Sequence, residues 1–295
     1  MIISPSVISP YKASTFQSGG APFVGLLDLY PSAAAAYSVR LLKSDYAGAL
    51  VEIRRSSDNA LKDFYPDSNN ELSLSSEDGS GTSLSSWITT DDGFVRTWYD
   101  QSGNGLDTTQ TTTSRQPQLL SVGALLTDNG KAGLDFSVND LAALTEATLS
   151  ISQPYSSSVV VNYATNSNDK YIYSQRPLGT GRSNIGKSNA TTKFFIHSGS
   201  NSGAVGDAIT ERQYGLFAIH DGASSELSIN GSNTTGLSAG TNSKDGLSIG
   251  NFKSPNSSFD YNWEGLIQEL VFWSGDKASD RPGIETNKND YYTIY

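Results

Sequence analysis

Short apolar runs recur along the chain, and turns rich in glycine, asparagine and serine separate them. Runs of apolar, β-branched and aromatic residues bounded by turn residues are typical of strands. Asn230-Gly231 also predicts a hairpin, because a type I′ turn needs positive φ at both central positions. We expect a two-sheet, all-β sandwich, with strands at 49–55, 94–99, 116–121, 132–136, 157–164, 170–174, 192–197, 213–220, 225–230, 246–250 and 264–273.

A few segments have helical features instead. Ser32 stands as a plausible N-cap before four alanines, which predicts a helix over 32–43. A short helix over 83–88 would pack Trp87, and a C-terminal helix over 278–292 has a capping serine or aspartate and a proline near its first turn. We expect the polar, acidic stretch 66–82 to be a surface loop.

Composition excludes several classes of function. The 295 residues carry a net charge of −10, which argues against binding to nucleic acid or to an anionic membrane, since both need a basic face. The chain has no cysteine, so neither disulfides nor thiolate metal sites can form. With two histidines, His197 and His220, we expect no zinc site and no cofactor.

The N-terminal segment differs from the rest. Residues 1–24 contain Pro5, Pro10, Pro22 and Gly19-Gly20, which predicts an extended arm, and 25–295 then form the sandwich domain. Two interpretations remain, a loose tail or an arm that orders against a partner chain, and its apolar residues favour the partner. The start lacks a basic and then long apolar stretch, so we expect no signal peptide, and no run approaches the roughly 18 apolar residues of a membrane span.

The stretch Trp98–Gly105 is the most informative motif. An aromatic, strand-like run breaks abruptly into a turn that contains Asp100, Gln101, Gly103, Asn104 and Gly105. Glycine adopts positive φ cheaply and Asp or Asn side chains accept hydrogen bonds from nearby backbone, so these residues predict a structural turn. A Ca²⁺ site at Asp100, Asn104 and Asp107 is the alternative, although no EF-hand pattern is present.

Two resemblances follow from such motifs. The segments Gly222–Gly231, Leu247–Gly250 and Trp263–Val271 look like the C-terminal half of concanavalin A-like, laminin-G-type jelly rolls. More specifically, the chain resembles the catalytic β-sandwich of the α-L-arabinofuranosidase B family. The matching pieces are Ala36–Ser38, Tyr46–Leu50, Arg55–Asp58, Tyr99–Gly105, Ile249–Gly250 and Ser279–Tyr295.

The family resemblance also implies where catalytic groups should stand. A retaining glycosidase needs two carboxylates, a nucleophile and a general acid/base. The family's Asp-x-Glu-Asn nucleophile motif falls on His197 to Gly199, and its acid/base aspartate falls at Phe252, after Ile249-Gly250. The family's paired cysteines are absent as well. Since glycine and phenylalanine supply neither role, we expect the inherited activity to be lost and the chain not to be an enzyme.

Other candidate catalytic residues have simpler explanations. Asp91-Asp92 and the pair Asp58 and Asp63 are typical turn and capping residues. His220 precedes a turn without a nucleophile motif, so we expect a hairpin histidine. Gly179-Thr180-Gly181 lacks the lysine and the helix of a phosphate-binding loop and predicts a flexible turn.

Aromatic side chains that stack on sugar faces and amides that bind hydroxyls favour a glycan-binding role. Most aromatics belong in the core, but Trp263 lies in a polar segment, so we expect it to be partly exposed. The residues predicted to bind a glycan are Trp263, Tyr261, Asn251 and His197.

Domains with the signatures Arg54–Asn59 and Trp98–Gly105 also resemble bacteriophage virion, fibre or tail proteins. This implies a virion structural protein, assembled in the host cytoplasm, that attaches to other virion proteins through residues 1–24. It would form a homo-oligomer and display the lectin-like sandwich to host surface glycans. The alternatives are an active glycoside hydrolase with relocated carboxylates, and a purely structural cement protein. The relocated carboxylates would come from Glu211, Asp207, Asp260 or Glu264.

Overall fold

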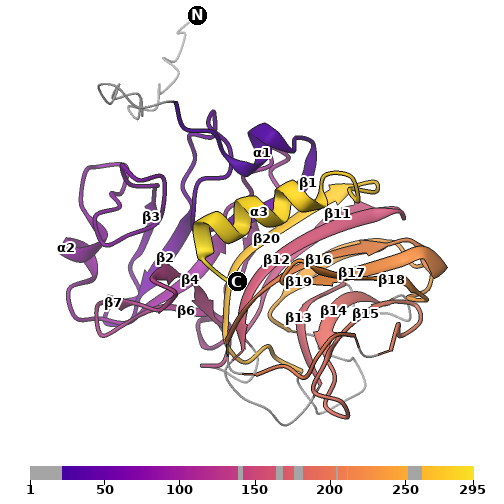
Figure 1. Cartoon of the computed structure of the whole chain (residues 1–295). Helices are drawn as coiled ribbons and strands as arrows, with labels where there is room; N and C mark the ends of the chain where they lie inside the picture. The colour runs from indigo at the N-terminus through magenta and orange to yellow at the C-terminus, as the bar shows by residue number, and fades with distance from the viewer. Residues whose placement is uncertain are drawn as a thin grey trace, which may run out of the picture.

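The computed structural model describes residues 22–138, 142–163, 169–175, 182–203, 205–210, 212–251 and 261–295. These residues form the predicted β-sandwich, drawn in Figure 1. Its strands are β1 (Ala33–Ser38), β2 (Val51–Arg55), β3 (Leu61–Phe64), β4 (Gly93–Trp98), β5 (Thr108–Thr109), β6 (Gln118–Ser121), β7 (Ala124–Leu125), β8 (Thr127–Asp128), β9 (Lys131–Ala132), β10 (Leu134–Asp135), β11 (Leu144–Ile151), β12 (Tyr155–Tyr163), β13 (Lys170–Ser174), β14 (Ser183–Lys187), β15 (Phe194–Ser198), β16 (Arg212–His220), β17 (Ser225–Ile229), β18 (Ser232–Leu237), β19 (Lys244–Ile249) and β20 (Leu266–Ser274). Its helices are α1 (Leu26–Leu29), α2 (Leu84–Ile88) and α3 (Arg281–Tyr292), with short 3₁₀ turns at Thr113–Arg115 and Gly222–Ser224.

The strands make two facing layers. Sheet 1 runs in the order β18-β17-β16-β12-β20-β1, with antiparallel neighbours throughout. Sheet 2 runs in the order β3-β2-β4-β5-β11-β19-β13-β14-β15, also antiparallel. Strands β10 and β6 join the layers, since β10 pairs with β20 and β6 pairs with β4.

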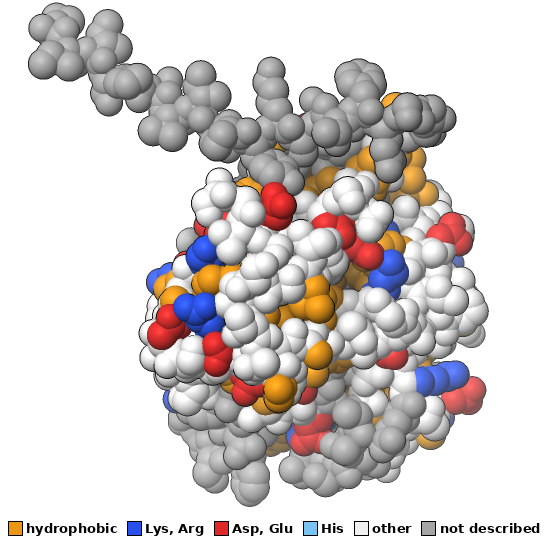
Figure 2. Space-filling model, turned by 90° about the vertical axis from the view of Figure 1, so that its left-hand side faces the viewer, with side chains coloured by type: hydrophobic (Ala, Val, Ile, Leu, Met, Phe, Trp, Pro, Cys, Tyr) orange, Lys and Arg blue, Asp and Glu red, His pale blue; other side chains and the backbone are white. Residues whose placement is uncertain are grey.

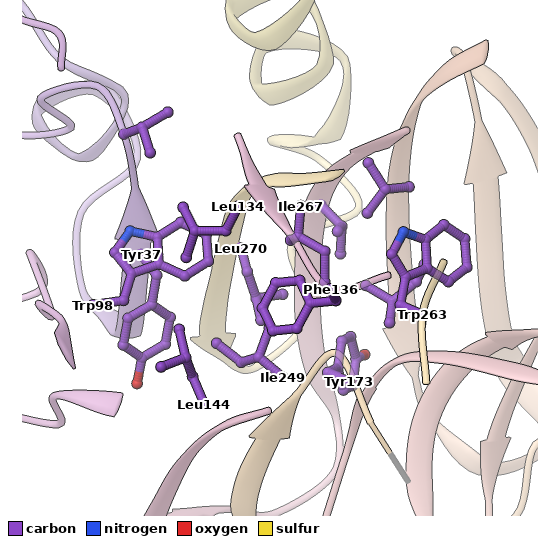
Figure 3. Packing of buried hydrophobic residues seen from close by; sticks show 14 of the residues in the cluster. Tyr37, Trp98, Leu134, Phe136, Leu144, Tyr173, Ile249, Trp263, Ile267 and Leu270 are labelled. Carbon is purple, nitrogen blue, oxygen red and sulfur yellow. The ribbon is translucent and has the colours of Figure 1, made fainter. Parts of the chain in front are cut away.

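The main core lies between the two sheets. Tyr37 and Leu270 enter it from sheet 1, and Trp98, Tyr173 and Ile249 enter it from sheet 2, all fully buried (Figure 3). Burying each such side chain stabilises the fold by ~1.5–3 kcal/mol, so this layer supplies most of the driving force for the sandwich.

Helix α3 covers the outer face of sheet 1 (Figure 1). Its Ile284 packs with Phe217 and Trp273 in a second apolar cluster. At its far end, buried Arg40 reaches Glu269 on β20, with Nε 2.7 Å from Oε2. As predicted, α3 begins after Asp280 and has a proline in its first turn.

The segment predicted as a helix over 32–43 is strand β1, so that prediction is wrong. Ser32 has a φ of 63°, and the chain from Ala33 pairs with β20 instead. Ala35 faces the main core, while Ala36 belongs to the cluster under α3. A strand buried on both faces between two packed layers favours small side chains, and this tertiary packing overrides the helical propensity of alanine.

The Trp98–Gly105 motif is an architectural turn, as predicted. One Asp100 carboxylate oxygen accepts hydrogen bonds from the backbone of Ala36 (2.8 Å) and Ser102 (2.9 Å), and the other from Leu106 (3.1 Å). Buried Gln101 also ties the turn to the segment after β1, because its Oε1 accepts a hydrogen bond from Leu42 N at 2.8 Å. The Asp100 oxygens bind backbone donors, so the turn is explained without an ion; the Ca²⁺ alternative stays a prediction.

Other local predictions are confirmed where capping or turn residues set the backbone conformation. Helix α2 follows the capping side chain of Ser83, and Asn230 and Gly231 turn between β17 and β18 with φ of 49° and 78°. Besides β1, the strands β3, β5, β7, β8, β11, β14 and β18 were not predicted. The sequences of β11, β14 and β18 are mostly polar, and pairing with neighbouring strands defines them.

The division into an arm and a sandwich stays a prediction, since residues 1–21 lie outside the described residues. Among the helices of the described chain, none is both long and apolar enough to cross a bilayer. On the face that carries α2 and β3, acidic and basic side chains are interspersed around a strip of hydrophobic ones (Figure 2).

Candidate functional site

Strands β13, β14 and β15 form the end of sheet 2, and their outward positions make two adjacent rows. Ile185 and Ile196 point into the core, so their neighbours along the strands face outward. Asn184 lies opposite His197 in one row, and Gly186 lies opposite Phe195 in the next. One row is therefore polar and the other aromatic.

The aromatic row is extended by two tyrosines. Tyr171 on β13 pairs with Gly186 and meets Phe195 edge-on, with ring centroids 5.7 Å apart. Tyr261 meets the other side of Tyr171, also edge-on at 5.7 Å. Gly186 makes this packing fit, because a Cβ there would lie 2.8 Å from the Phe195 ring and 2.6 Å from the carbonyl oxygen of Lys170. The three rings form a cluster separate from the main core.

Amide side chains flank these rings. Asn251 Nδ2 donates to Asn262 Oδ1 at 2.6 Å, and Asn262 forms a backbone bridge with Tyr171. We call the set Tyr171, Asn184, Phe195, His197, Asn251, Tyr261 and Asn262 the amide–aromatic face.

Two of the amides have polar atoms without a partner. Asn184 is 1% exposed, and neither its Oδ1 nor its Nδ2 has a hydrogen-bond partner. Asn251 Oδ1, in a residue 4% exposed, also lacks one. A buried polar group left unsatisfied costs ~1–3 kcal/mol. Such groups call for a partner from outside the chain, either a ligand or ordered water.

Charged groups border the face. Lys170 forms an ion pair with Glu264, and the Lys170 side chain is nearly buried. Burial and then the nearby carboxylate of Asp169 raise the pKa of Tyr171 to about 12, so its phenol stays protonated. Burial, with a contribution from the charge of Arg182, lowers the pKa of His197. At neutral pH its imidazole is uncharged and offers one donor and one acceptor.

The structure brings together three of the four residues predicted to bind a glycan, namely His197, Asn251 and Tyr261. The prediction that Trp263 is partly exposed is wrong. Trp263 is 0% exposed and stacks near Phe194 in the core, and its Nε1 donates to the carbonyl of Asn162 at 2.9 Å (Figure 3). The polar sequence before Trp263 suggested exposure, but contacts from distant strands decide its burial.

The face also contains residues that the sequence did not indicate. Asn184 lies on the unpredicted strand β14. Tyr171 and Phe195 belong to predicted strands, but their outward orientation depends on a register shift in β13 and on the alternation in β15. One feature of the sequence could have indicated these residues, namely an outward-facing aromatic residue opposite a glycine on the paired strand. It can be recognised only when the strand pairing is already known.

The family resemblance places its two catalytic carboxylates at Gly199 and Phe252. Gly199, just after β15, has a φ of 99°, and a Cβ there would lie 2.8 Å from Asn242 Nδ2. No carboxylate fits that place without a shift of the backbone or of Asn242. Phe252 lies outside the described residues, as do Glu211 and Asp260. Of the relocated carboxylates considered, Glu264 pairs with Lys170 on β13, and Asp207 lines a separate pocket.

Asp58 and Asp91 have the expected turn and capping roles, but that expectation is wrong for Asp63, which lies within strand β3 and accepts a hydrogen bond from Tyr99 OH at 2.7 Å. Asp58 pairs with Arg55 and accepts from Ala60 N, and Asp91 accepts from Ser57 Oγ. Within the described ranges, no group of three or more His, Asp and Glu side chains could hold a metal ion.

His220 is more than a hairpin residue. It is fully buried at the end of β16, where Nδ1 lies 2.6 Å from Ser198 Oγ and Nε2 lies 3.2 Å from Tyr173 OH. Its ring stacks on Tyr155 at 4.4 Å. Burial, then the charge of Lys244, lowers its pKa to about 3. This Ser–His pair is sealed in the core and therefore serves packing rather than nucleophilic catalysis.

Comparisons with known proteins support the fold. No protein-family profile matches the sequence, and no curated protein does. Among solved structures, the chain is similar to a GH54 α-L-arabinofuranosidase soaked with a cyclic sulfate inhibitor, with a TM-score of 0.67 and 17% identity over 89% of this chain. An arabinofuranosidase complexed with arabinofuranosyl-α-1,2-xylobiose gives a TM-score of 0.65 and 16% identity over 89% of this chain. In both cases the match spans 63% of the other chain's length.

The comparisons also correct one expectation. We expected a protein that is not an enzyme, because Gly199 and Phe252 stand at the implied catalytic places. The solved structures named above, to which this chain is similar, are glycoside hydrolases, which contradicts that expectation. The loss of carboxylates at two inherited positions does not argue against catalysis by others.

Proposed function

We propose that this chain binds a glycan on the amide–aromatic face. The observation that carries the proposal is the buried Asn184 side chain, whose two polar atoms lack partners beside the aromatic row of Tyr171 and Phe195. Sugars present hydroxyls that donate and accept at once, as an amide does, and C–H faces that pack on aromatic rings. A sugar that reached these buried groups would satisfy the amides and pack against the rings.

The class of glycan to test first is one that carries arabinofuranose. The structurally similar enzymes bind arabinofuranosyl-α-1,2-xylobiose and 4-nitrophenyl α-L-arabinofuranoside. The neutral imidazole of His197 and the amides of this face suit uncharged sugars.

The test compares two asparagines of the β14–β15 hairpin. Asn184→Ala should weaken binding of arabinofuranosyl-xylobiose about tenfold or more in calorimetry, the equivalent of ~1.4 kcal/mol. Asn189→Ala, at an exposed position in the intervening turn, should leave binding unchanged. Because the Asn184 amide is unsatisfied, its removal should leave thermal stability unchanged or higher, which separates loss of binding from loss of folding.

Equal affinity in both variants would overturn this assignment of the site. Absence of saturable binding of the wild-type chain to any arabinofuranosyl probe would overturn the choice of glycan.

Glycoside hydrolysis is a second candidate function, and one observation favours it. Two carboxylates lie close to β13, because Glu264 pairs with Lys170 and the charge of Asp169 acts on Tyr171 of the amide–aromatic face. Two carboxylates beside a sugar are the minimum equipment of a glycosidase. Release of 4-nitrophenol from 4-nitrophenyl α-L-arabinofuranoside tests it. Turnover should fall at least a hundredfold in Glu264→Gln or Asp169→Asn, since acid–base groups contribute on that order. Turnover unaffected by either change would exclude this pair.

We also propose that the protein is displayed on a bacteriophage particle as a homo-oligomer, attached through residues 1–24. The support is the resemblance of Arg54–Asn59 and Trp98–Gly105 to virion proteins, and both segments form turns and strand ends that maintain the scaffold. Deletion of residues 2–21 should abolish incorporation into purified particles, measured by mass spectrometry, while glycan binding persists. Incorporation without glycan binding would favour the cement protein, and absence from particles would refute the virion role.

A further inference from the structure

A pocket is lined in part by residues of β15 and β18, strands that lie at the end of the molecule opposite α2 (Figure 1). Its volume is about 260 Å³, and it opens between the segment 205–210 and strands β16 to β18. Sites for drug-sized ligands are typically ~300–1,000 Å³, so this pocket has the size of one small ring.

The pocket is built from well-packed parts. Its floor holds the rings of Tyr214 and Phe194, which meet edge-on at 5.1 Å and are almost fully buried. Val205 N donates to the Phe194 carbonyl at 2.8 Å, and Thr210 N donates to Tyr214 OH at 2.9 Å. The segment 205–210 is therefore tied at both ends, which forms the pocket before any ligand arrives.

Close packing of one wall also indicates that the pocket is formed before a ligand binds. A Cβ at Gly206 would lie 2.7 Å from the Cδ1 of Ile229, so the loop rests directly on that side chain.

Several polar side chains of the pocket are free to bind. The guanidinium of Arg212 lies 4.9 Å from the centroid of the Tyr214 ring, and it makes no ion pair or hydrogen bond with any described residue. In the same part of the chain, Asp207, Ser232 and Thr234 likewise make no side-chain hydrogen bond. Arg212 and Asp207 share the pocket without pairing, so each keeps its charge for a ligand.

We propose that this pocket binds the carboxylate-bearing ring of an acidic saccharide, a uronic acid. Arg212 would bind the carboxylate through a bidentate pair of hydrogen bonds, which the planar guanidinium favours. Asp207 would accept ring hydroxyls, and Ser232 and Thr234 would bind the remaining hydroxyls. The Tyr214 ring both orients Arg212 and offers an apolar face to the sugar.

One cation and one carboxylate give the pocket no net charge. A doubly charged phosphate is attracted by Arg212 and repelled by Asp207 twice as strongly as a singly charged carboxylate, so its extra charge brings no net advantage. A neutral sugar would leave Arg212 without a counter-charge. A monoanionic, hydroxyl-rich ring meets both groups.

The experiment measures binding of D-glucuronate to the full chain by saturation-transfer NMR and calorimetry, against methyl glucoside and glucose 6-phosphate. Glucuronate should bind most tightly. Arg212→Gln should weaken its binding about tenfold or more, while Arg115→Gln, which removes the same charge elsewhere, should not. Asp207→Asn should shift the preference towards glucose 6-phosphate. Asn184→Ala should leave glucuronate binding intact, so this pocket and the proposed glycan site fail or succeed separately.

Three results would overturn the proposal. They are no saturable binding of glucuronate to the wild-type chain, equal binding of methyl glucoside, and glucuronate binding that Arg212→Gln leaves unchanged. Thermal unfolding of Arg212→Gln, at an exposed position, should match that of the wild-type chain, so a loss of binding reports on the pocket.

Discussion

Replacing Asp100 by alanine should destabilise the fold strongly while leaving sugar recognition intact. Asp100 is 4% exposed, and its two oxygens accept from the backbone of Ala36, Ser102 and Leu106 and from the Ser102 hydroxyl. The Ala36 N–H lies in β1 and is fully buried, so it would lose its partner without gaining water.

The magnitude follows from these contacts. An unsatisfied buried N–H costs ~1–3 kcal/mol, and each exposed turn hydrogen bond to a carboxylate, partly replaced by water, adds ~1 kcal/mol. The free energy of unfolding should therefore fall by ~3–5 kcal/mol, a large part of the ~5–15 kcal/mol of a typical domain.

Urea unfolding followed by tryptophan fluorescence measures this loss. Asp45→Ala is the matched control, because Asp45 makes only an exposed ion pair with Lys43 and should cost less than ~1 kcal/mol. A loss below ~1 kcal/mol in Asp100→Ala would refute the view that the motif holds β1 in place. Loss of glycan binding in the folded variant would instead make the motif part of a binding site.

Two further predictions concern buried groups, and a third compares two glycines. Arg40→Met should cost ~3–5 kcal/mol in urea unfolding because Glu269 stays buried without its partner, and adding Glu269→Leu should recover most of it. The pKa of His220 is about 3 when folded and ordinary when unfolded, so stability is full above pH 6.5 and falls towards pH 3, by up to ~1.4 kcal/mol per pH unit; His220→Gln should flatten this dependence. Gly199→Ala should destabilise more than Gly203→Ala, since both have positive φ but open space surrounds only Gly203; equal thermal shifts would contradict the clash.

Local chemistry in the sequence was sufficient for several elements. The Asp100 turn, the short helix at 83–88, the Asn230-Gly231 hairpin and the proline in α3 were predicted correctly, because each depends on backbone conformations that neighbouring residues set by themselves. Apolar runs located most strands of the sandwich for a similar reason. An apolar run must be buried somewhere, and a sandwich of many short strands is the compact way to do it.

The failures concern residues whose environment comes from distant segments. Ala33 to Ala36 form a strand because β20 pairs with them and two clusters bury both faces, which no local propensity expresses. Trp263 is buried because Phe194 and Asn162 approach it from other strands.

The candidate sites also depend partly on local sequence and partly on contacts between distant segments. The sequence determined which side chains could bind a sugar, and three of the residues it indicated, His197, Asn251 and Tyr261, belong to the amide–aromatic face; that they bind a glycan stays a prediction. The tertiary structure decided which of them meet, placed the unsatisfied Asn184 beside Tyr171 and Phe195, and formed the pocket of Arg212 and Asp207. The physical reason is that side chains on a strand alternate between faces, so register and pairing, rather than composition, decide which groups share a surface.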